Sequence, residues 1–230
     1  MVLVLRTLGY RALWLADRFA GRRVAHEHTQ ALRVEAWYAD PRVHVLRTDF
    51  MVGREEVVFD VGGYEGEWLT EMYSRQPCRI EVFEPVKEFA TSLAERFQPN
   101  DDIRVHGYGL AGSAREVLMS VEGARSSSVT GLRSDRYQYA RLRDVVSVLD
   151  ELAPHGVALM KINIEGGEYE VLERLLAQGR AASVRQFLIQ FHDHVADASG
   201  RRTAIRHRLA QTHDLLWDFP WIWEAWRRRD

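Results

Sequence analysis

The chain has 230 residues, of which 46% are hydrophobic and 28% are charged, and its formal net charge is −2. This length and composition fit one soluble globular domain with a sizeable core, and they argue against disorder. A chain this close to neutral lacks the basic field that nonspecific nucleic-acid binding needs, so neither DNA nor RNA is an expected partner. The single cysteine, Cys78, excludes an intrachain disulfide and fits a reducing cytoplasm.

Residues 1–23 predict an amphipathic helix. Apolar side chains recur there at spacings of three and four, namely Leu5, Leu8, Ala12, Leu15 and Phe19. Arginines interrupt this stretch, so we expect neither a signal peptide nor a transmembrane span. Two roles stay open: packing over the following domain, or peripheral contact with anionic lipid or a membrane-bound glycan assembly. Residues 24–54 are expected to form short mixed segments, with a turn at Asp40.

The stretch 57–68, VVFDVGGYEGEW, combines a β-branched run, an acid and three glycines before an amphipathic segment begins. It predicts a strand, a tight turn and the start of a helix. The glycines let the backbone approach a ligand closely, and the helix that begins near Glu67 offers unpaired N–H groups to that ligand. Asp60, at the end of the strand, is expected to point its carboxylate into the same crevice.

A second strand is predicted at residues 79–85, RIEVFEP, and it ends in Glu84. At an offset of roughly 20 residues from the glycine-rich turn, α/β nucleoside binders place an acid on the ribose hydroxyls. The turn and this acid together favour a nucleoside cofactor.

Helices are predicted after both strands, a third strand at 103–108, and a fourth extended piece at 116–121. Alternating strands and helices predict a parallel sheet with right-handed crossovers and with ligands at the carboxyl ends of the strands. The polar loop 123–131, GARSSSVTG, is either a solvated turn or a loop that binds sugar hydroxyls or closes over the cofactor. A helix is predicted next, at 145–152.

A central buried strand is predicted at 157–164, and alternation places Lys161, Asn163 and Glu165 on one face. Burying a lysine is costly without a partner, so Lys161 is expected to pair with Glu165 or with a group on a neighbouring strand. Asn163 and Glu165 are expected at the open end of the strand, facing cofactor and acceptor. Glu168 then places a negative charge at the start of the next helix.

The strand predicted at 186–191 runs into His192, Asp193 and His194. A histidine at the carboxyl end of such a strand, with an ordinary pKa near ~6.5, is a candidate general base. Asp193 or Glu165 is expected to orient the His192 ring. The alternatives left open are a histidine hydrogen-bonded in a surface loop, and Glu165 as the base.

The C-terminal part predicts a helix to about His213 and then an antiparallel hairpin formed by 214–219 and 221–226. Four of the seven tryptophans lie in this hairpin: Trp217, Trp221, Trp223 and Trp226. They are expected to pack in the core and sheet or at a homodimer interface. A second hypothesis is a wall that stacks on sugars, with polar contacts from His213 and Glu224.

In order, these motifs resemble the FkbM-type S-adenosylmethionine-dependent methyltransferases over roughly residues 56–193. The resemblance rests on the Asp60 glycine loop, on Glu84 followed by Pro85, on the serine cluster 126–128, on the run KINIEGGEY at 161–169, and on the strand ending in His192. It implies an α/β, doubly wound, Rossmann-like sheet of seven strands, and methyl transfer, usually to an oxygen of a sugar or natural product.

The resemblance also assigns roles to residues. The residues expected to bind S-adenosylmethionine are Asp60, Gly62, Gly63, Tyr64, Gly66, Glu84, Pro85, Leu110 and Asn163. Leu110 lies near the implied adenine position, although a core residue is the alternative. The residues expected to contact the acceptor are Ser127, Ser128, Glu168, Asp193, His213 and Trp223. His192 and Glu165 are the expected catalytic pair.

Asn163 stands where many members of that family carry aspartate. An amide is a poorer ligand for a hard cation than a carboxylate, so no metal is expected. We divide the chain into an N-terminal helical extension, 1–54, and a methyltransferase domain, 55–230. The expected reaction is O-methylation of a saccharide or sugar-bearing metabolite. The alternatives are methylation of a polyketide or peptide natural product, and a nucleoside-binding module without activity.

Overall fold

The computed structural model describes residues 22–121 and 136–230. The helices are α2 (Arg22–Ala39), α3 (Val43–Leu46), α4 (Glu67–Arg75), α5 (Lys87–Phe97), α6 (Val145–Leu152), α7 (Glu168–Ala177), the 3₁₀ helix η2 (Arg180–Ser183) and α8 (Ala198–Leu209). The strands are β1 (Val57–Val61), β2 (Arg79–Phe83), β3 (Ile103–His106), β4 (Gly109–Ala111), β5 (Arg115–Ser120), β6 (Tyr137–Asp144), β7 (Leu159–Ile162), β8 (Gln186–Ile189), β9 (His213–Phe219) and β10 (Trp223–Arg228).

Two compact units divide between His44 and Val45. The domain division predicted from the sequence, 1–54 and 55–230, stays a prediction. The first unit holds α2, an 18-residue helix where the sequence predicted short mixed segments, so that prediction is wrong. Its sequence contains neither glycine nor proline and is rich in alanine, arginine and glutamate, which favour helix. The turn predicted at Asp40 is confirmed, whereas most of the amphipathic helix predicted at 1–23 lies outside the described residues.

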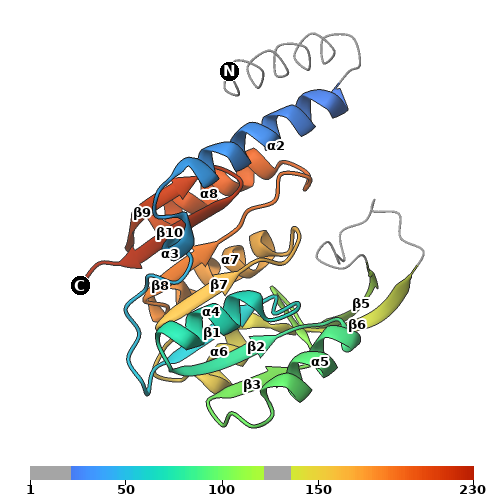
Figure 1. Cartoon of the computed structure of the whole chain (residues 1–230), viewed down its shortest axis with the longest axis vertical. Helices are drawn as coiled ribbons and strands as arrows, with labels where there is room; N and C mark the ends of the chain where they lie inside the picture. Colours follow the sequence, from blue (N-terminus) through green and yellow to red (C-terminus); the bar gives the residue numbers. More distant parts are fainter. Residues whose placement is uncertain (1–21, 122–135) are drawn as a thin grey trace, which may run out of the picture. The chain divides into compact units, whose positions relative to one another are not determined.

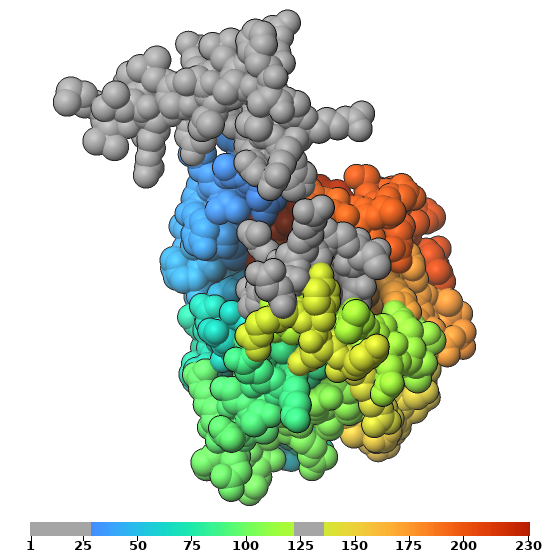
Figure 2. Space-filling model, turned by 90° about the vertical axis from the view of Figure 1, so that its right-hand side faces the viewer, coloured from blue at the N-terminus to red at the C-terminus, as the bar shows by residue number. Residues whose placement is uncertain are grey.

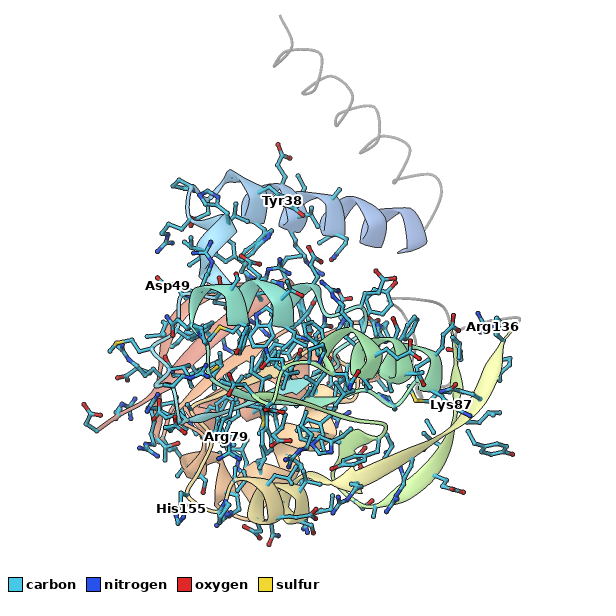
Figure 3. The ribbon with its side chains drawn as sticks, turned by 60° about the horizontal axis from the view of Figure 1, so that its bottom comes forward. Tyr38, Asp49, Arg79, Lys87, Arg136 and His155 are labelled. Carbon is cyan, nitrogen blue, oxygen red and sulfur yellow. The ribbon has the colours of Figure 1, made fainter. Side chains whose placement is uncertain are left out.

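The second unit contains a seven-stranded sheet with the order β3-β2-β1-β7-β8-β10-β9, drawn in Figure 1. β3, β2, β1, β7 and β8 run parallel, and β10 and β9 complete the sheet as the predicted antiparallel hairpin. The helices α4 and α5 cover one face of the sheet and α6 covers the other (Figure 3). The predicted doubly wound α/β fold is therefore confirmed.

Strand order places β1 beside β7, although about a hundred residues separate them in the chain. β1 leads to β2 on one side, and β7 leads to β8 on the other. In open α/β sheets, such a switch point opens a crevice outside the carboxyl ends of the two strands. β1, β7 and β8 are almost wholly buried, as expected of parallel strands covered on both faces.

A separate three-stranded sheet, with the order β4-β6-β5, projects beside α5 (Figure 1). The extended piece predicted at 116–121 is β5, which therefore belongs to this second sheet. Its partner β6 was not predicted. Figure 2 looks onto the side of the molecule from which β5 and β6 project. Outer-face side chains such as Leu118 and Tyr139 are exposed, whereas Met119 and Ala140 on the inner face are buried.

None of the helices in the described ranges is long and apolar enough to cross a bilayer.

Candidate active site

Asp60 and Lys161 form a buried ion pair at the carboxyl edge of β1 and β7. Lys161 Nζ lies 2.9 Å from Asp60 Oδ1 and donates a second hydrogen bond, of 2.6 Å, to the carbonyl oxygen of Gly62. Burial raises the pKa of Asp60, and the charge of Lys161 opposes that rise. The partner of Lys161 is thus on the neighbouring strand, one of the two predicted alternatives. The pair fixes the strand end and the start of the glycine-rich turn together.

The glycine-rich turn passes directly over β7. Gly62 has φ +92°, and a Cβ atom at this position would lie 2.1 Å from the carbonyl oxygen of Asn163. Gly63 and Gly66 are crowded differently: a Cβ would lie 2.5 Å from Val82 Cγ1 in the first case and 2.7 Å from Leu93 Cδ2 in the second. These three glycines therefore let the turn pack against β7, β2 and α5.

Glu84 connects the end of β2 to this turn. Its Oε2 accepts the Tyr64 backbone N–H at 2.8 Å, and its Oε1 accepts the Val86 N–H at 2.9 Å. Burial raises the pKa of Glu84, while these two hydrogen bonds oppose the rise. Carboxylate oxygens can each accept more than one hydrogen bond, so Glu84 retains capacity for ligand hydroxyls.

A cavity of about 100 Å³ opens between these elements. Its lining residues are Gly62, Tyr64, Glu84, Pro85, Val86, Phe89, Met119, Asn163, Ile164 and Glu165. Ligand cavities usually measure ~300–1,000 Å³, so this cavity is smaller than one that would enclose a whole nucleoside cofactor.

Two hydrogen-bond acceptors at this edge are buried without a partner: Asp60 Oδ2 and Asn163 Oδ1. Leaving such an atom unpaired costs about 1–3 kcal/mol, so native proteins seldom do it without a ligand or water to pair with it. The two atoms suit a ligand that donates hydrogen bonds, such as the ammonium and hydroxyl groups of S-adenosylmethionine. The residues at this edge therefore fit the expected cofactor.

His192, which follows β8, lies between two carboxylates. Its Nε2 is 3.2 Å from Glu165 Oε1, and its Nδ1 is 3.2 Å from Glu168 Oε1. Burial alone would lower the pKa of His192, but the hydrogen bonds and charges of Glu165 and Glu168 outweigh burial and raise it to about 10. The near-neutral pKa expected from the sequence is therefore wrong, because two acids from the turn after β7 reach the same ring.

The comparisons with known proteins identify the family of the chain. The family model described as the methyltransferase FkbM domain matches residues 60–215, more than half of the chain. The chain belongs to the FkbM methyltransferase family. The resemblance recognised in the sequence is therefore confirmed. No curated protein matches the chain.

Two solved structures share the fold of this FkbM domain. Methyltransferase FkbM from Methylobacillus flagellatus KT is 15% identical with a TM-score of 0.53, and the match covers 79% of this chain and 46% of that one. The chain thus spans about half the length of that protein. A putative rRNA-methylase from Clostridium thermocellum is 9% identical with a TM-score of 0.52, and the match covers 82% of this chain and 94% of that one. At such identities the likeness shows the fold alone.

Five of the nine residues predicted to bind the cofactor line the cavity of this FkbM domain, and Asp60, Gly63 and Gly66 belong to the adjoining strand end and turn. Tyr64, Pro85 and Asn163 line the cavity with Gly62 and Glu84. Leu110, in β4, is instead buried in the main hydrophobic core and is not among the residues lining the cavity. Leu110 is therefore a core residue, which was the alternative interpretation of its sequence position.

Three residues predicted to contact the acceptor are buried. Glu168 is fully buried, and its oxygens already accept the Gly166 N–H and the His192 N–H. His213 lies at the opposite edge of the sheet, where Nε2 is 2.9 Å from the Val184 carbonyl oxygen. Trp223 packs in β10 with 7% of its surface exposed, too little for stacking on a sugar. These three assignments are corrected: sequence spacing did not show which side chains the core would cover.

The remaining acceptor assignments stay predictions. Asp193 is half-buried next to His192. Ser127 and Ser128 lie outside the described residues.

Sequence reasoning did not assign Phe89 and Met119 to the site. Phe89, on α5, contacts the Tyr64 ring edge-on, with 4.8 Å between centroids. Met119 reaches the cavity from β5, and no signal in the sequence places the second sheet there. In the described ranges no cluster of three metal-ligating side chains occurs, and the expected absence of a metal stays a prediction.

Proposed function

We propose that this methyltransferase uses S-adenosylmethionine to methylate a hydroxyl group of a saccharide or sugar-bearing metabolite. The observation that carries the cofactor proposal is the pair of unpartnered acceptors, Asp60 Oδ2 and Asn163 Oδ1, beside Glu84. A carboxylate, a second buried acid and an amide at one crevice match the hydrogen-bond donors of an amino-acid-bearing nucleoside.

Different residues of the chain would bind different parts of the cofactor. Asp60, fixed by Lys161, would accept a hydrogen bond from the cofactor's ammonium group. Glu84, fixed by two backbone N–H groups, would accept from the ribose hydroxyls. The Tyr64 and Phe89 rings would cover the apolar part of the ligand.

The acceptor proposal rests on the family resemblance and on one feature of the site. Glu165 lies at the cavity, and 19% of its side chain is exposed, so its carboxylate is available to take a proton from an acceptor hydroxyl bound there. RNA is a less favoured acceptor because the net charge of −2 supplies no general attraction for a polyanion. We further propose a cytoplasmic location, consistent with the single buried thiol of Cys78.

Calorimetry with S-adenosylhomocysteine and, separately, with NAD tests the cofactor. We expect binding of S-adenosylhomocysteine only. Binding of NAD alone would overturn the proposal.

A methyl-transfer screen tests the acceptor, with nucleotide sugars, oligosaccharides, polyketide and peptide natural products, and RNA as separate arms. Turnover is expected in a sugar arm and should survive EDTA. Turnover only on a polyketide or peptide would establish the alternative acceptor. Tight S-adenosylhomocysteine binding without turnover in any arm would favour a binding module.

A further inference from the structure

The contacts of His192 require two protons on its ring. Both ring nitrogens are 3.2 Å from a carboxylate oxygen, one on Glu165 and the other on Glu168. An ionised carboxylate only accepts hydrogen bonds, whereas a neutral imidazole carries one N–H and one lone pair. Either neutral tautomer would therefore direct a lone pair at a negative oxygen. The geometry fits an imidazolium cation that donates to both acids.

Glu168 holds this cation from inside the protein. Its Oε1 accepts the His192 backbone N–H at 2.8 Å as well as contacting the ring, and its Oε2 accepts the Gly166 N–H at 2.9 Å. Tyr169 adds a hydrogen bond of 2.8 Å from its hydroxyl to the His192 carbonyl oxygen. The first turn of α7 thus fixes both the backbone and the ring of His192.

Glu165 is the member of the cluster that can meet a substrate. Its side chain is 19% exposed and lines the cavity, whereas Glu168 is fully buried. Its backbone is left-handed, with φ +49°, a conformation that is uncommon outside glycine and recurs at functional sites. The neighbouring Gly166 N–H is held by Glu168, so the same buried acid also fixes the peptide that carries Glu165.

We infer that Glu165, rather than His192, takes the proton of the acceptor hydroxyl. His192 is then a permanent cation that orients Glu165, and Glu168 is a positioning residue. This inference rests on the proposed O-methylation. In the step itself, the acceptor oxygen forms a bond to the methyl carbon of S-adenosylmethionine, the S–CH₃ bond breaks with its electron pair left on sulfur, and the acceptor's proton passes to Glu165.

The electrostatic surroundings of His192 are acidic on two sides. Glu165 approaches from the loop after β7 and Glu168 from α7, while the His194 ring lies 5.6 Å away between centroids and Asp193 is adjacent in the chain. Arg201, on α8, lies over the Tyr169 ring at 4.7 Å rather than against His192. With its pKa raised to about 10, His192 would remain charged throughout the neutral range.

Nitrogen-15 NMR of the histidine rings tests the protonation state without any acceptor or cofactor. The His192 signals are assigned by their loss in His192→Gln. We expect both ring nitrogens to be protonated at neutral pH and to titrate only near pH 10. A neutral His192 ring at pH 7 to 8 would overturn the inference.

Two variants on one helix separate the role of Glu168 from a general effect of charge. Glu168→Gln should lower the titration midpoint of His192, whereas Glu170→Gln, also in the first turn of α7, pairs with Arg115 and should leave it unchanged. Equal shifts in the two variants would contradict the positioning role. If Glu168→Gln fails to fold, the wild-type titration still decides whether His192 is a cation.

Turnover then tests the proton acceptor. Glu165→Gln should lower kcat by roughly 10²–10⁴-fold, the size of a general-base contribution, with unchanged affinity for S-adenosylhomocysteine. His192→Gln should retain more activity, because glutamine still donates one hydrogen bond. Near-normal kcat in Glu165→Gln would overturn its role. A wild-type protein that methylates nothing would refute the proposed function while leaving the NMR result intact.

Discussion

Both edges of the main sheet have cavities and charged side chains, but the edges differ in cavity volume and in whether their buried polar atoms have hydrogen-bond partners. The amino edge holds a cavity of about 490 Å³, several times larger than the one at the carboxyl edge. Arg79 and His155, which line it, lie on one side of Figure 3, and Lys87 and Arg136 lie on the other. At the amino edge Arg185 donates to Glu56 at 2.6 Å and to the Met51 carbonyl oxygen at 2.8 Å.

The carboxyl edge, in contrast, leaves polar atoms unpartnered. Three buried side-chain atoms within the described ranges lack a hydrogen-bond partner, and two of them, Asp60 Oδ2 and Asn163 Oδ1, are at this edge. Four non-glycine residues of the described segments have positive φ: Tyr64, Glu165, Asp197 and Trp221. Each follows a strand that ends at the carboxyl edge. Unpartnered atoms and strained backbone, more than cavity size, distinguish the edge where we propose that the cofactor binds.

The largest expected difference between the edges concerns their ion pairs. Lys161→Met should lower the free energy of unfolding by about 3–5 kcal/mol, because it leaves the buried Asp60 carboxylate without its partner. Arg185→Met at the amino edge should cost less than about 1 kcal/mol, since both members of that pair are more than a third exposed. Urea denaturation of both variants measures this difference. If both variants lost the same free energy of unfolding, burial would not make the ion pair at one edge more important for stability than the pair at the other.

The two buried histidines should give opposite pH responses. The folded-state pKa of His192 is raised to about 10, so its stabilisation is fully present below the unfolded value near ~6.5 and is lost as the pH rises through about 10. Burial lowers the pKa of His213 at the amino edge, so its effect is a loss of stability as the pH falls below about 6.5.

Stability measured by urea denaturation from neutral pH to about pH 10 should fall by about 3 kcal/mol more in the wild type than in His192→Gln. Parallel curves for the two proteins would contradict a raised pKa at His192. His213→Gln should instead remove part of the acid-side loss.

A matched pair of glycines separates strain from ligand binding. Gly62 (φ +92°) and Gly156 (φ +103°) each sit so that a Cβ would clash with a backbone oxygen, that of Asn163 in the first case and of Ser183 in the second. Alanine at either position should destabilise the protein by about 1–3 kcal/mol. Only Gly62→Ala should also reduce S-adenosylhomocysteine affinity, by more than about tenfold. If calorimetry shows the same loss for Gly156→Ala, the effect is one of folding.

The smallest expected effect is on one ligand contact. Glu84→Ala should weaken S-adenosylhomocysteine binding by about 1–3 kcal/mol, the usual cost of removing a buried hydrogen-bond partner. Glu56→Ala, the corresponding change at the amino edge, should leave that affinity unaltered. Unchanged binding in Glu84→Ala would remove Glu84 from the ribose role.

Much of the fold could be predicted because its signals are local. A few residues suffice to predict each of these elements: the apolar runs of β1 and β8 indicate strands, and the glycines after β1 indicate a turn. β6 was not predicted because its sequence, YQYARLRD, contains no long apolar run. Tyrosines and arginines alternate in it with small or apolar residues. Its place in a second sheet depends on pairing with β5 and β4, which are short strands without a distinct pattern.

At the candidate site, the positions of Asp60, Gly62 and Glu84 could be predicted from the sequence, whereas the contacts of His192 could not. Asp60, Gly62 and Glu84 belong to motifs whose spacing sets their position. The charge of His192 instead depends on Glu168, 24 residues earlier in the chain, which turns inward at the start of α7. Glu165 was one of the two acids expected to orient the His192 ring, but nothing in the sequence indicates that Glu168 would contact the ring as well.

The ion pair between Lys161 and Asp60 also bears on how the protein reaches its native state. It joins residues 101 positions apart, through parallel pairing of β7 with β1. Contacts of such long sequence separation require the intervening chain to lose much of its freedom first, so they slow folding. Because Gly62, Asn163 and Glu165 meet only after that pairing, a chain with only the β1–β2 half assembled lacks the cavity where we propose that the cofactor binds. The ability to bind S-adenosylhomocysteine should therefore appear late in refolding, together with the last increase in compactness.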